Sequence, residues 1–182
     1  MKLKQLNLKT LLVTLILFVS ATLHAQDKTK VIGNKPREGS SNFSFSVTKD
    51  HQVGVKMNAG RKPVQLLKLN FGVKNPNKDS LKFKVNVYEF TEDQPGENLA
   101  KERIIGVMLP GKNRLNIDLS AANIVTKGPI LVAIEFLSTY KGSEPAFSIG
   151  LFNGGTYRYE GSEWKKTPVA GVDFNVLVKQ VK

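Results

Sequence analysis

The chain has 182 residues, a formal net charge of +12 at pH 7 and no cysteine. The length is enough for one domain with a hydrophobic core. The missing cysteine excludes disulfides, thiolate metal sites and a cysteine nucleophile. With two histidines in the whole chain, a His-rich zinc site is excluded as well, and little is left for catalysis centred on imidazole.

The first 25 residues have the composition of a secretory signal peptide. A basic start with Lys2, Lys4 and Lys9 precedes the apolar run 11–19, and small residues then lead to Ala25. These parts, in this order, are typical of a cleaved export signal. The apolar run is shorter than the roughly 20 residues that a spanning helix needs. We therefore predict cleavage after Ala25 and a periplasmic or extracellular protein without a transmembrane segment. With no cysteine to carry a lipid, we do not expect a lipoprotein.

Two segments follow the predicted signal peptide. Residues 26–41 are polar, contain glycine, proline and serine, and follow no period, which predicts a flexible lead-in. Over residues 42–182, apolar and polar residues alternate in short segments, the pattern of half-buried β-strands. In the clearest segment, 81–87, alternate residues are apolar, and the same alternation places Glu89 on the inward face.

The segment 130–137 is apolar on both faces apart from Glu135, which predicts a central strand covered on both sides. Turn-forming residues separate the strands, and Asn153-Gly154-Gly155 predicts a hairpin turn. Two segments, 98–103 and 120–124, are long enough for one helical turn at most. About nine or ten short strands at regular spacing predict a single antiparallel, jelly-roll-like β-sandwich.

A resemblance covers the segment 81–137. A strand reading FKVNVYEF is followed by QPGENL, LNIDLSAANI and GPILVAIEFL. This order resembles the jelly-roll modules of exported, largely uncharacterised proteins of Gram-negative bacteria, including those that accompany carboxypeptidase-like regulatory domains. Tyr157, Tyr159 and Trp164 resemble the aromatic segment before the closing strand of such modules. The resemblance implies a fold and a compartment, and it carries over no catalytic residue.

Those three aromatic residues are the candidate ligand-binding site. Tyrosine and tryptophan combine a flat apolar ring with a polar group, which suits stacking on sugars. Tyr157, Tyr159 and Trp164 lie close together in sequence around a turn, where binding residues are common. The alternative is that the two tyrosines fill the core and Trp164 closes one end of the sandwich.

Catalysis is the second hypothesis for the function. Glycoside hydrolysis needs two carboxylates about 5–10 Å apart across a cleft. The candidates in this chain are Glu89, Glu92, Asp93, Asp118, Glu135 and Glu163. No spacing among them identifies a pair, and a buried carboxylate is more often paired with lysine or arginine. We therefore predict no catalytic residue.

Two further binding chemistries are open. Asn75, Asn77 and Asp79 form an oxygen-bearing turn, but calcium needs about six to eight oxygens, so we predict an ordinary turn, no metal site and no cofactor. The positive charge would suit a polyanion-binding envelope protein, although the lysines are spread along the strands as solvent-facing residues would be. No nucleic-acid partner is expected.

The sequence therefore favours an exported, non-catalytic binding or accessory module whose partner is a glycan or an envelope protein. A glycan-active hydrolase and a polyanion-binding protein are the alternatives.

Overall fold

The computed structural model describes residues 28–37 and 41–181. The predicted signal peptide, residues 1–25, lies outside the described residues. Within them, no helix has the length and apolar character that crossing a bilayer would require.

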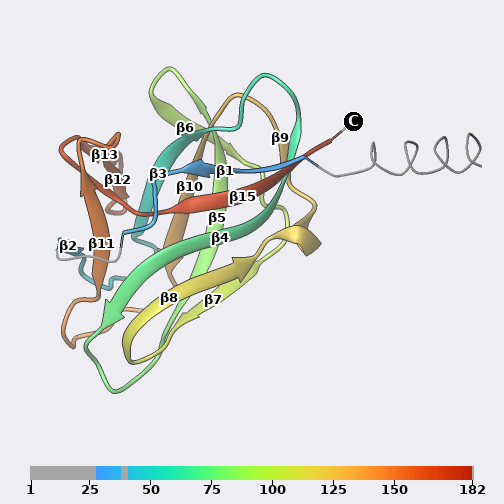
Figure 1. Cartoon of the computed structure of the whole chain (residues 1–182). Coiled ribbons are helices and arrows are strands. Elements are labelled where there is room, and N and C mark those ends of the chain that lie inside the picture. The colour runs from blue at the N-terminus through green and yellow to red at the C-terminus, as the bar shows by residue number, and fades with distance from the viewer. Residues whose placement is uncertain (1–27, 38–40, 182) are drawn as a thin grey trace, which may run out of the picture.

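The described chain folds into two curled antiparallel sheets that pack face to face as a β-sandwich (Figure 1). Sheet A contains β1 (Thr29–Gly33), β2 (Asn42–Ser44), β4 (Val64–Asn75), β8 (Gly111–Asp118), β9 (Val125–Thr126), β11 (Ala146–Leu151), β14 (Ala170–Val172) and β15 (Asn175–Gln180). Sheet B contains β3 (Gln52–Asn58), β5 (Leu81–Thr91), β6 (Gln94–Asn98), β7 (Ile104–Met108), β10 (Pro129–Phe136), β12 (Thr156–Tyr159) and β13 (Trp164–Thr167). The predicted all-β sandwich is confirmed.

The structure has more strands than the sequence pattern predicted, fifteen in the described residues against nine or ten. Part of the surplus comes from pieces of two or three residues, such as β9 and β14. Such pieces are too short to show an alternation in sequence. One of the two possible helical turns forms, as a 3₁₀ turn at Ser120–Ala122.

The lead-in differs from its prediction because part of it belongs to the sheet. Residues 29–33 form β1, which pairs antiparallel with β15 in the register Val31 to Leu177. Ile32 turns inward and is 8% exposed. The pairing supplies the hydrogen-bond partners and the apolar contact that a polar segment lacks when considered alone.

The core lies between the two sheets. The inward side chains of 81–87 are buried as predicted, and Phe83 is fully buried against Phe71 of β4, with ring centroids 5.8 Å apart. β10 is the predicted central strand, since it lies between β3 and β5 and its outward Leu131 is fully buried too. Glu89 lies on the same face as Val87, as predicted, since it stands opposite the buried Ile130 of β10, but its side chain is exposed near the end of the strand.

Most turns carry the chain from one sheet to the other. The predicted hairpin turn at 153–155 joins β11 of sheet A to β12 of sheet B, so it links two strands that do not pair. Gly154 and Gly155 have φ angles of +97° and +83°, which favour glycine. The prediction of a turn at these residues is therefore confirmed. The prediction that the turn closes a hairpin was wrong, because a turn does not specify which strand the next strand pairs with.

Candidate functional site

One row of side chains crosses the outer face of sheet B and ends in two of the predicted aromatic residues. The strand registers place Lys84 opposite Glu135, Glu135 opposite Gln52, Gln52 opposite Tyr159, and Tyr159 opposite Trp164. Neighbouring strands lie about 4.8 Å apart. The row therefore places charged, amide and aromatic groups side by side over a distance that a short oligosaccharide could span.

The three predicted aromatic residues do not share one environment. Tyr159 and Trp164 are partly exposed, and their ring centroids lie 5.6 Å apart with the planes tilted by 45°. Tyr157 is only 4% exposed. The structure therefore leaves Tyr159 and Trp164 accessible to a ligand, whereas Tyr157 is a packing residue.

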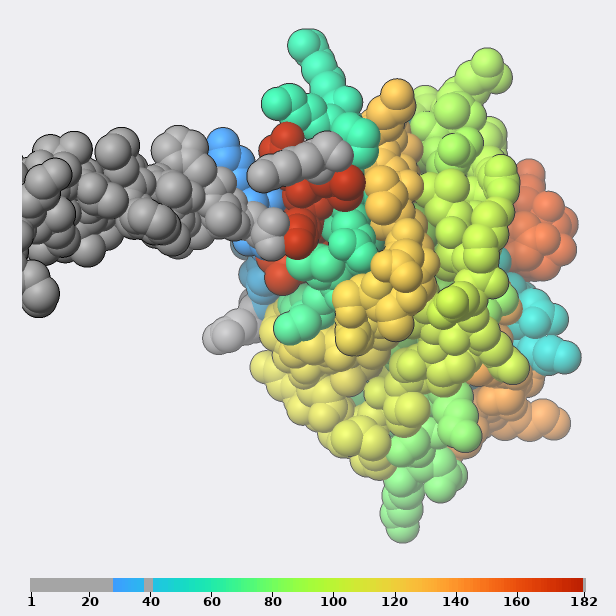
Figure 2. Space-filling view, turned by 90° about the vertical axis from the view of Figure 1, so that its right-hand side faces the viewer, coloured from blue at the N-terminus to red at the C-terminus, as the bar shows by residue number. Residues whose placement is uncertain are grey.

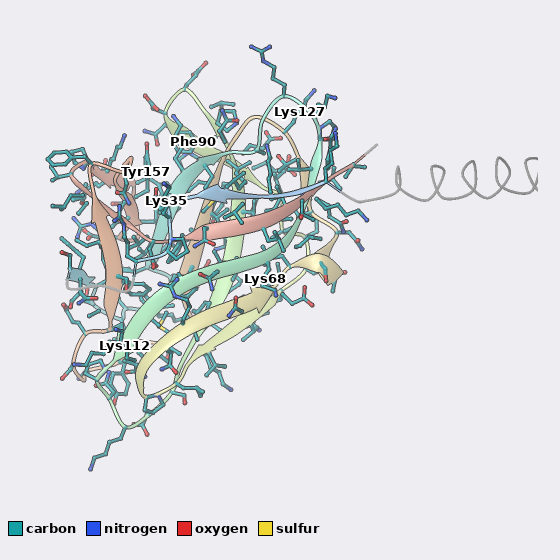
Figure 3. The ribbon with its side chains drawn as sticks, viewed as in Figure 1. Lys35, Lys68, Phe90, Lys112, Lys127 and Tyr157 are labelled. Carbon is teal, nitrogen blue, oxygen red and sulfur yellow. The ribbon has the colours of Figure 1, made fainter. Side chains whose placement is uncertain are left out.

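Tyr157 belongs to a small hydrophobic cluster on the outer face of sheet B. It packs edge-on against Phe90, with ring centroids 5.2 Å apart, and the two residues, labelled in Figure 3, form a cluster with the fully buried Leu131. The ammonium groups of Lys166 and Lys56 lie 5.5 Å from the Tyr157 ring and 4.6 Å from the Phe90 ring. These cation–π contacts cover the solvent-facing side of the cluster.

Small residues in the middle of this face leave room for the rings. Gly54 of β3 lies opposite Ala133 of β10, and a Cβ on Gly54 would come within 2.8 Å of the Ala133 Cβ. Tyr88 also reaches this area and packs edge-on against Trp164, with ring centroids 5.8 Å apart. Trp164 is therefore held between Tyr88 and Tyr159, which fixes the orientation of the accessible indole.

A buried polar network connects the aromatic residues to the carboxylate of Glu135. The Asn86 amide donates to Glu135 Oε2 at 2.7 Å and to Gln52 Oε1 at 3.0 Å. Tyr88 donates its hydroxyl proton to the same Gln52 oxygen at 2.9 Å. Lys84 Nζ forms an ion pair with Glu135 Oε2 at 2.9 Å. Because these groups restrain one another, they form a preorganised polar surface.

A groove of about 420 Å³ opens in front of this network. It lies beside Glu135 and Asn86 and is bounded by the segment that joins β6 to β7. The lining residues are Lys49, Asp50, Lys84, Asn86, Asn98, Ala100, Lys101, Glu102, Arg103, Glu135 and Leu137. Amide, carboxylate and ammonium groups together can donate to and accept from the hydroxyl groups of a polar ligand.

The environment of this site changes the acidity of Tyr88. Burial raises the pKa of the Tyr88 hydroxyl above its ordinary value, the hydrogen bond to Gln52 lowers it, and the negative charge of Glu135 raises it. The hydroxyl therefore keeps its proton, and its role as a donor to Gln52, to higher pH than an exposed tyrosine would.

Sequence reasoning missed most of the polar residues of this site. Lys84 and Asn86 were expected on the polar face of their strand, but only the register of β5 with β10 brings them to Glu135. Of the six candidate carboxylates, Glu135 alone lines the groove, where its neighbours are Asp50 and Glu102. Asp93 and Glu163 instead form exposed ion pairs with Lys56 and Lys165.

The oxygen-bearing turn at 75–79 is held together by its own amides. Asn75 Oδ1 accepts from the backbone N–H and the side-chain amide of Asn77, at 3.1 and 2.9 Å. Asn77 also exchanges hydrogen bonds with the backbone of Ser143. These contacts use the amide oxygens to join two turns of the fold.

A fully buried carboxylate lies beside sheet A, between β14 and β15. Asp173 is fully buried and accepts hydrogen bonds from the backbone N–H groups of Gly72 and Arg37, at 2.8 and 3.0 Å. Arg114 of β8 forms an ion pair with the same Asp173 carboxylate at 2.7 Å. This centre joins the segment after β1 to sheet A.

Comparison with known proteins shows similarity in structure only, since no protein-family model and no curated protein matches the chain. The structure of the cysteine protease and lectin-like domains of Cwp84, a surface layer associated protein of Clostridium difficile, aligns over 80% of this chain with a TM-score of 0.53 and 11% identity. The clostridial cysteine protease Cwp84 after propeptide cleavage aligns over 84%, with a TM-score of 0.58 and 12% identity. This chain spans 37% and 40% of those two chains. The similarity therefore shows a shared β-sandwich fold.

Proposed function

We propose that this protein is an exported, non-catalytic binding module that recognises a neutral glycan on the outer face of sheet B. The observation that carries the proposal is the row from Glu135 through Gln52 to Tyr159 and Trp164, which continues into a polar groove. Sugar rings stack on accessible aromatic side chains while their hydroxyl groups bond to amides and carboxylates. An envelope glycan is the expected partner.

Two independent observations support this function. The lectin-like domain of Cwp84 occurs in a protein described as surface layer associated, and its fold resembles this one. The N-terminal segment of this chain has the composition of an export signal, and the resemblance to jelly-roll modules of exported Gram-negative proteins implies the same compartment. We therefore expect the mature protein in the periplasm or outside the cell.

The export part of the proposal has its own test. Expression of the full chain in a Gram-negative host, followed by fractionation and N-terminal sequencing, should yield a soluble protein that begins at Gln26, because cleavage follows the small residue Ala25. A protein that keeps its first residues and stays with the membrane would contradict it.

The binding part is tested with a glycan array and the chain from residue 26. Wild-type protein should retain at least one neutral glycan, and Trp164→Ala should weaken that binding roughly three- to tenfold, because one aromatic contact contributes about 0.5–1.5 kcal/mol. Phe152→Ala is the matched control, since Phe152 is an aromatic residue 85% exposed outside the row.

Thermal melting of both variants separates loss of binding from loss of folding. An equal loss in the two variants, or retention unchanged by Trp164→Ala, would contradict the assigned site. The same glycan incubated with the protein should release no new reducing ends, since the proposal assigns Glu135 a binding role. Release that disappears in Glu135→Gln would instead establish the hydrolase.

A further inference from the structure

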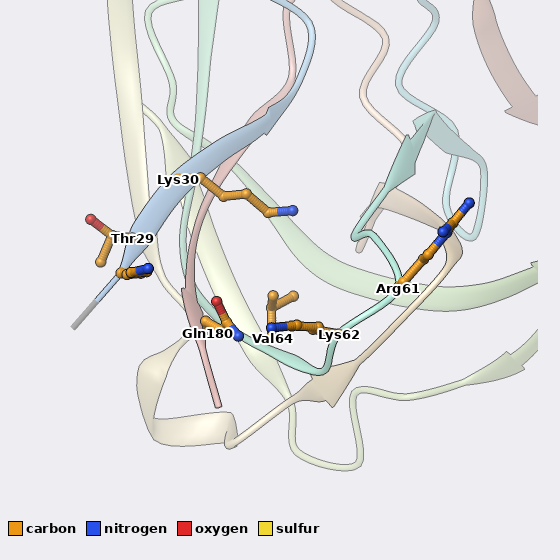
Figure 4. Close-up of a pocket in the computed structure, with 7 residues that line it drawn as sticks. Thr29, Lys30, Arg61, Lys62, Val64 and Gln180 are labelled. Atoms are coloured by element: carbon orange, nitrogen blue, oxygen red, sulfur yellow. The ribbon is translucent and has the colours of Figure 1, made fainter. Parts of the chain in front are cut away.

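A second cavity is lined by residues of β1 and β15 and of the segment before β4, and it shares no lining residue with the groove on sheet B. The two strands pair with each other, and they lie side by side in Figures 1 and 2. The cavity has a volume of about 340 Å³. Its lining residues are Lys28, Thr29, Lys30, Arg61, Lys62, Val64 and Gln180. In the close-up, Lys30 extends from β1 toward the segment that carries Arg61 and Lys62 (Figure 4). Four of the seven lining residues are cationic and none is acidic.

These positive charges are not neutralised within the described part of the chain. In residues 28–37 and 41–181, no carboxylate forms an ion pair with Arg61 or Lys62. The Lys30 ammonium donates to the carbonyl oxygen of Ala59 at 2.9 Å, a neutral partner. Like charges gathered around one cavity repel one another, and an anion in the cavity would relieve that repulsion.

The segment that carries two of the cations is held rigidly. Ala59 donates its N–H to the carbonyl of Gly128 at 2.8 Å, and the N–H of Gly128 donates back to Gly60 at 2.7 Å. Gly60 has a φ of +100°, which favours glycine, and its own N–H is bonded to Asn58 Oδ1 at 2.9 Å. Arg61 and Lys62 therefore follow a turn whose backbone is held in place, so little backbone ordering is needed when a ligand binds.

The shape and lining indicate the class of ligand. Val64 is 2% exposed and forms an apolar floor, while Thr29 and Gln180 add neutral hydrogen-bonding groups beside the cations. A planar guanidinium with ammonium groups suits an oxyanion with several acceptor oxygens. A cavity of this size fits one small group, with a neutral part against Val64 and the anion among the cations.

A membrane surface fits this site less well. Cations that bind a bilayer lie together on one face beside apolar residues that insert into it. Here the cations come from two segments around a concavity. Phe152, 85% exposed, belongs to the turn after β11, at the opposite side of sheet A from β1 (Figure 1). Nearer the cavity, Val31 of β1 and Val125 of β9 are exposed, but two separate valines offer little apolar surface for insertion into a bilayer.

We propose that this pocket binds a sulfate or phosphate ester carried by a sugar. The site is separate from the row on sheet B, and the choice of a sugar as the carrier of the anion rests on the proposed glycan-binding function. A module with both sites would distinguish glycans by charge as well as by shape.

Calorimetric titration tests the proposal with a sulfated oligosaccharide prepared from heparin, its desulfated counterpart, and vesicles of phosphatidylcholine with phosphatidylglycerol. The sulfated oligosaccharide should bind, more weakly as salt is raised. The desulfated form should bind roughly tenfold more weakly or not at all, the loss expected from one charge-assisted contact. The vesicles should not bind.

Arg61→Ala combined with Lys62→Ala should lower the affinity for the sulfated oligosaccharide by roughly tenfold or more. The matched control is Lys78→Ala combined with Lys141→Ala, which removes the same charge from two exposed lysines outside the pocket. Trp164→Ala should leave this binding unchanged, so failure here is distinguishable from failure of the neutral-glycan site. Equal losses in the two double variants, binding to vesicles alone, or no binding would overturn the proposal.

Discussion

The outer face of sheet B and the interior of sheet A each hold a carboxylate paired with a cation, in opposite settings. In sheet A, Asp173 is fully buried and both of its oxygens accept hydrogen bonds from the protein. In sheet B, the Glu135 side chain is 14% exposed, lines a groove, and its Oε2 accepts from both Lys84 and Asn86.

The difference shows how one kind of interaction can serve two purposes. A buried carboxylate surrounded by protein donors fixes the fold, because removing either partner leaves a charge or a donor unpaired. A carboxylate at the wall of a groove, held in place by a few protein partners, remains accessible, so a ligand can replace the water bound to it. Substitutions at the two sites should therefore affect different measurements.

The largest expected effect is on stability, in sheet A. Asp173→Ala leaves Arg114 and two backbone N–H groups without their acceptor. It should lower the free energy of unfolding by about 3 kcal/mol, the lower end of the range for a broken buried pair, because the Arg114 side chain is 30% exposed. Chemical denaturation measures the change. Glu163→Ala, in an exposed ion pair, is the control and should change it by less than about 0.5 kcal/mol.

At Glu135 a substitution should affect ligand affinity more than it affects stability. Glu135→Gln keeps an oxygen for Asn86 and removes only a partly exposed ion pair, so the free energy of unfolding should change by less than about 1 kcal/mol. Affinity for the retained glycan should fall roughly tenfold, since hydrogen bonds to a charged group contribute about 1.5–3 kcal/mol. A large loss of stability with unchanged affinity would make Glu135 a structural residue like Asp173.

Alkaline titration should show the protected state of the Tyr88 hydroxyl. Its pKa is raised in the folded protein, so its contribution to stability is complete below the ordinary tyrosine pKa and is lost as pH rises through the raised value. The pKa of Tyr140 is raised as well, by desolvation and by the neighbouring Asp79, so absorbance of the phenolate, followed against pH, should show two late-titrating groups. Tyr88→Phe should remove one of them and leave the other, and a titration curve that keeps both in that variant would contradict the assignment.

The smallest effect is expected at an exposed carboxylate with only local partners. Asp118 accepts from the hydroxyl and the backbone N–H of Ser120 at 2.6 and 2.8 Å, and these bonds lower its pKa. Its contribution to stability is therefore present above the ordinary aspartate pKa and is lost as pH falls through the lowered value. Melting temperatures of wild type and Ser120→Ala should differ slightly at neutral pH and converge in acid. A difference that widens in acid would contradict this account.

The alternation of side chains predicted the sandwich and much of its core, because period two records directly which face is buried. Leu81 and Phe83 are buried and Lys82 between them is exposed, as expected. Alternation placed Glu89 on the face of Val87 but did not show that it is exposed, because the neighbours that other strands supply do not appear in one strand's sequence. For the same reason, the sequence showed Tyr159 and Trp164 but not the link from Glu135 through Gln52.

The pairing of β1 with β15 has a consequence for how the protein is made. The ribosome synthesises β1 among the first structured residues, and its neighbour in the sheet only when synthesis reaches Gln180. Sheet A therefore cannot be completed while the chain is still growing, and contacts between such distant segments form slowly. Until then, the edge of β1 is unprotected and open to pairing with other chains. Sheet A of the nascent protein thus stays incomplete until β15 has been synthesised.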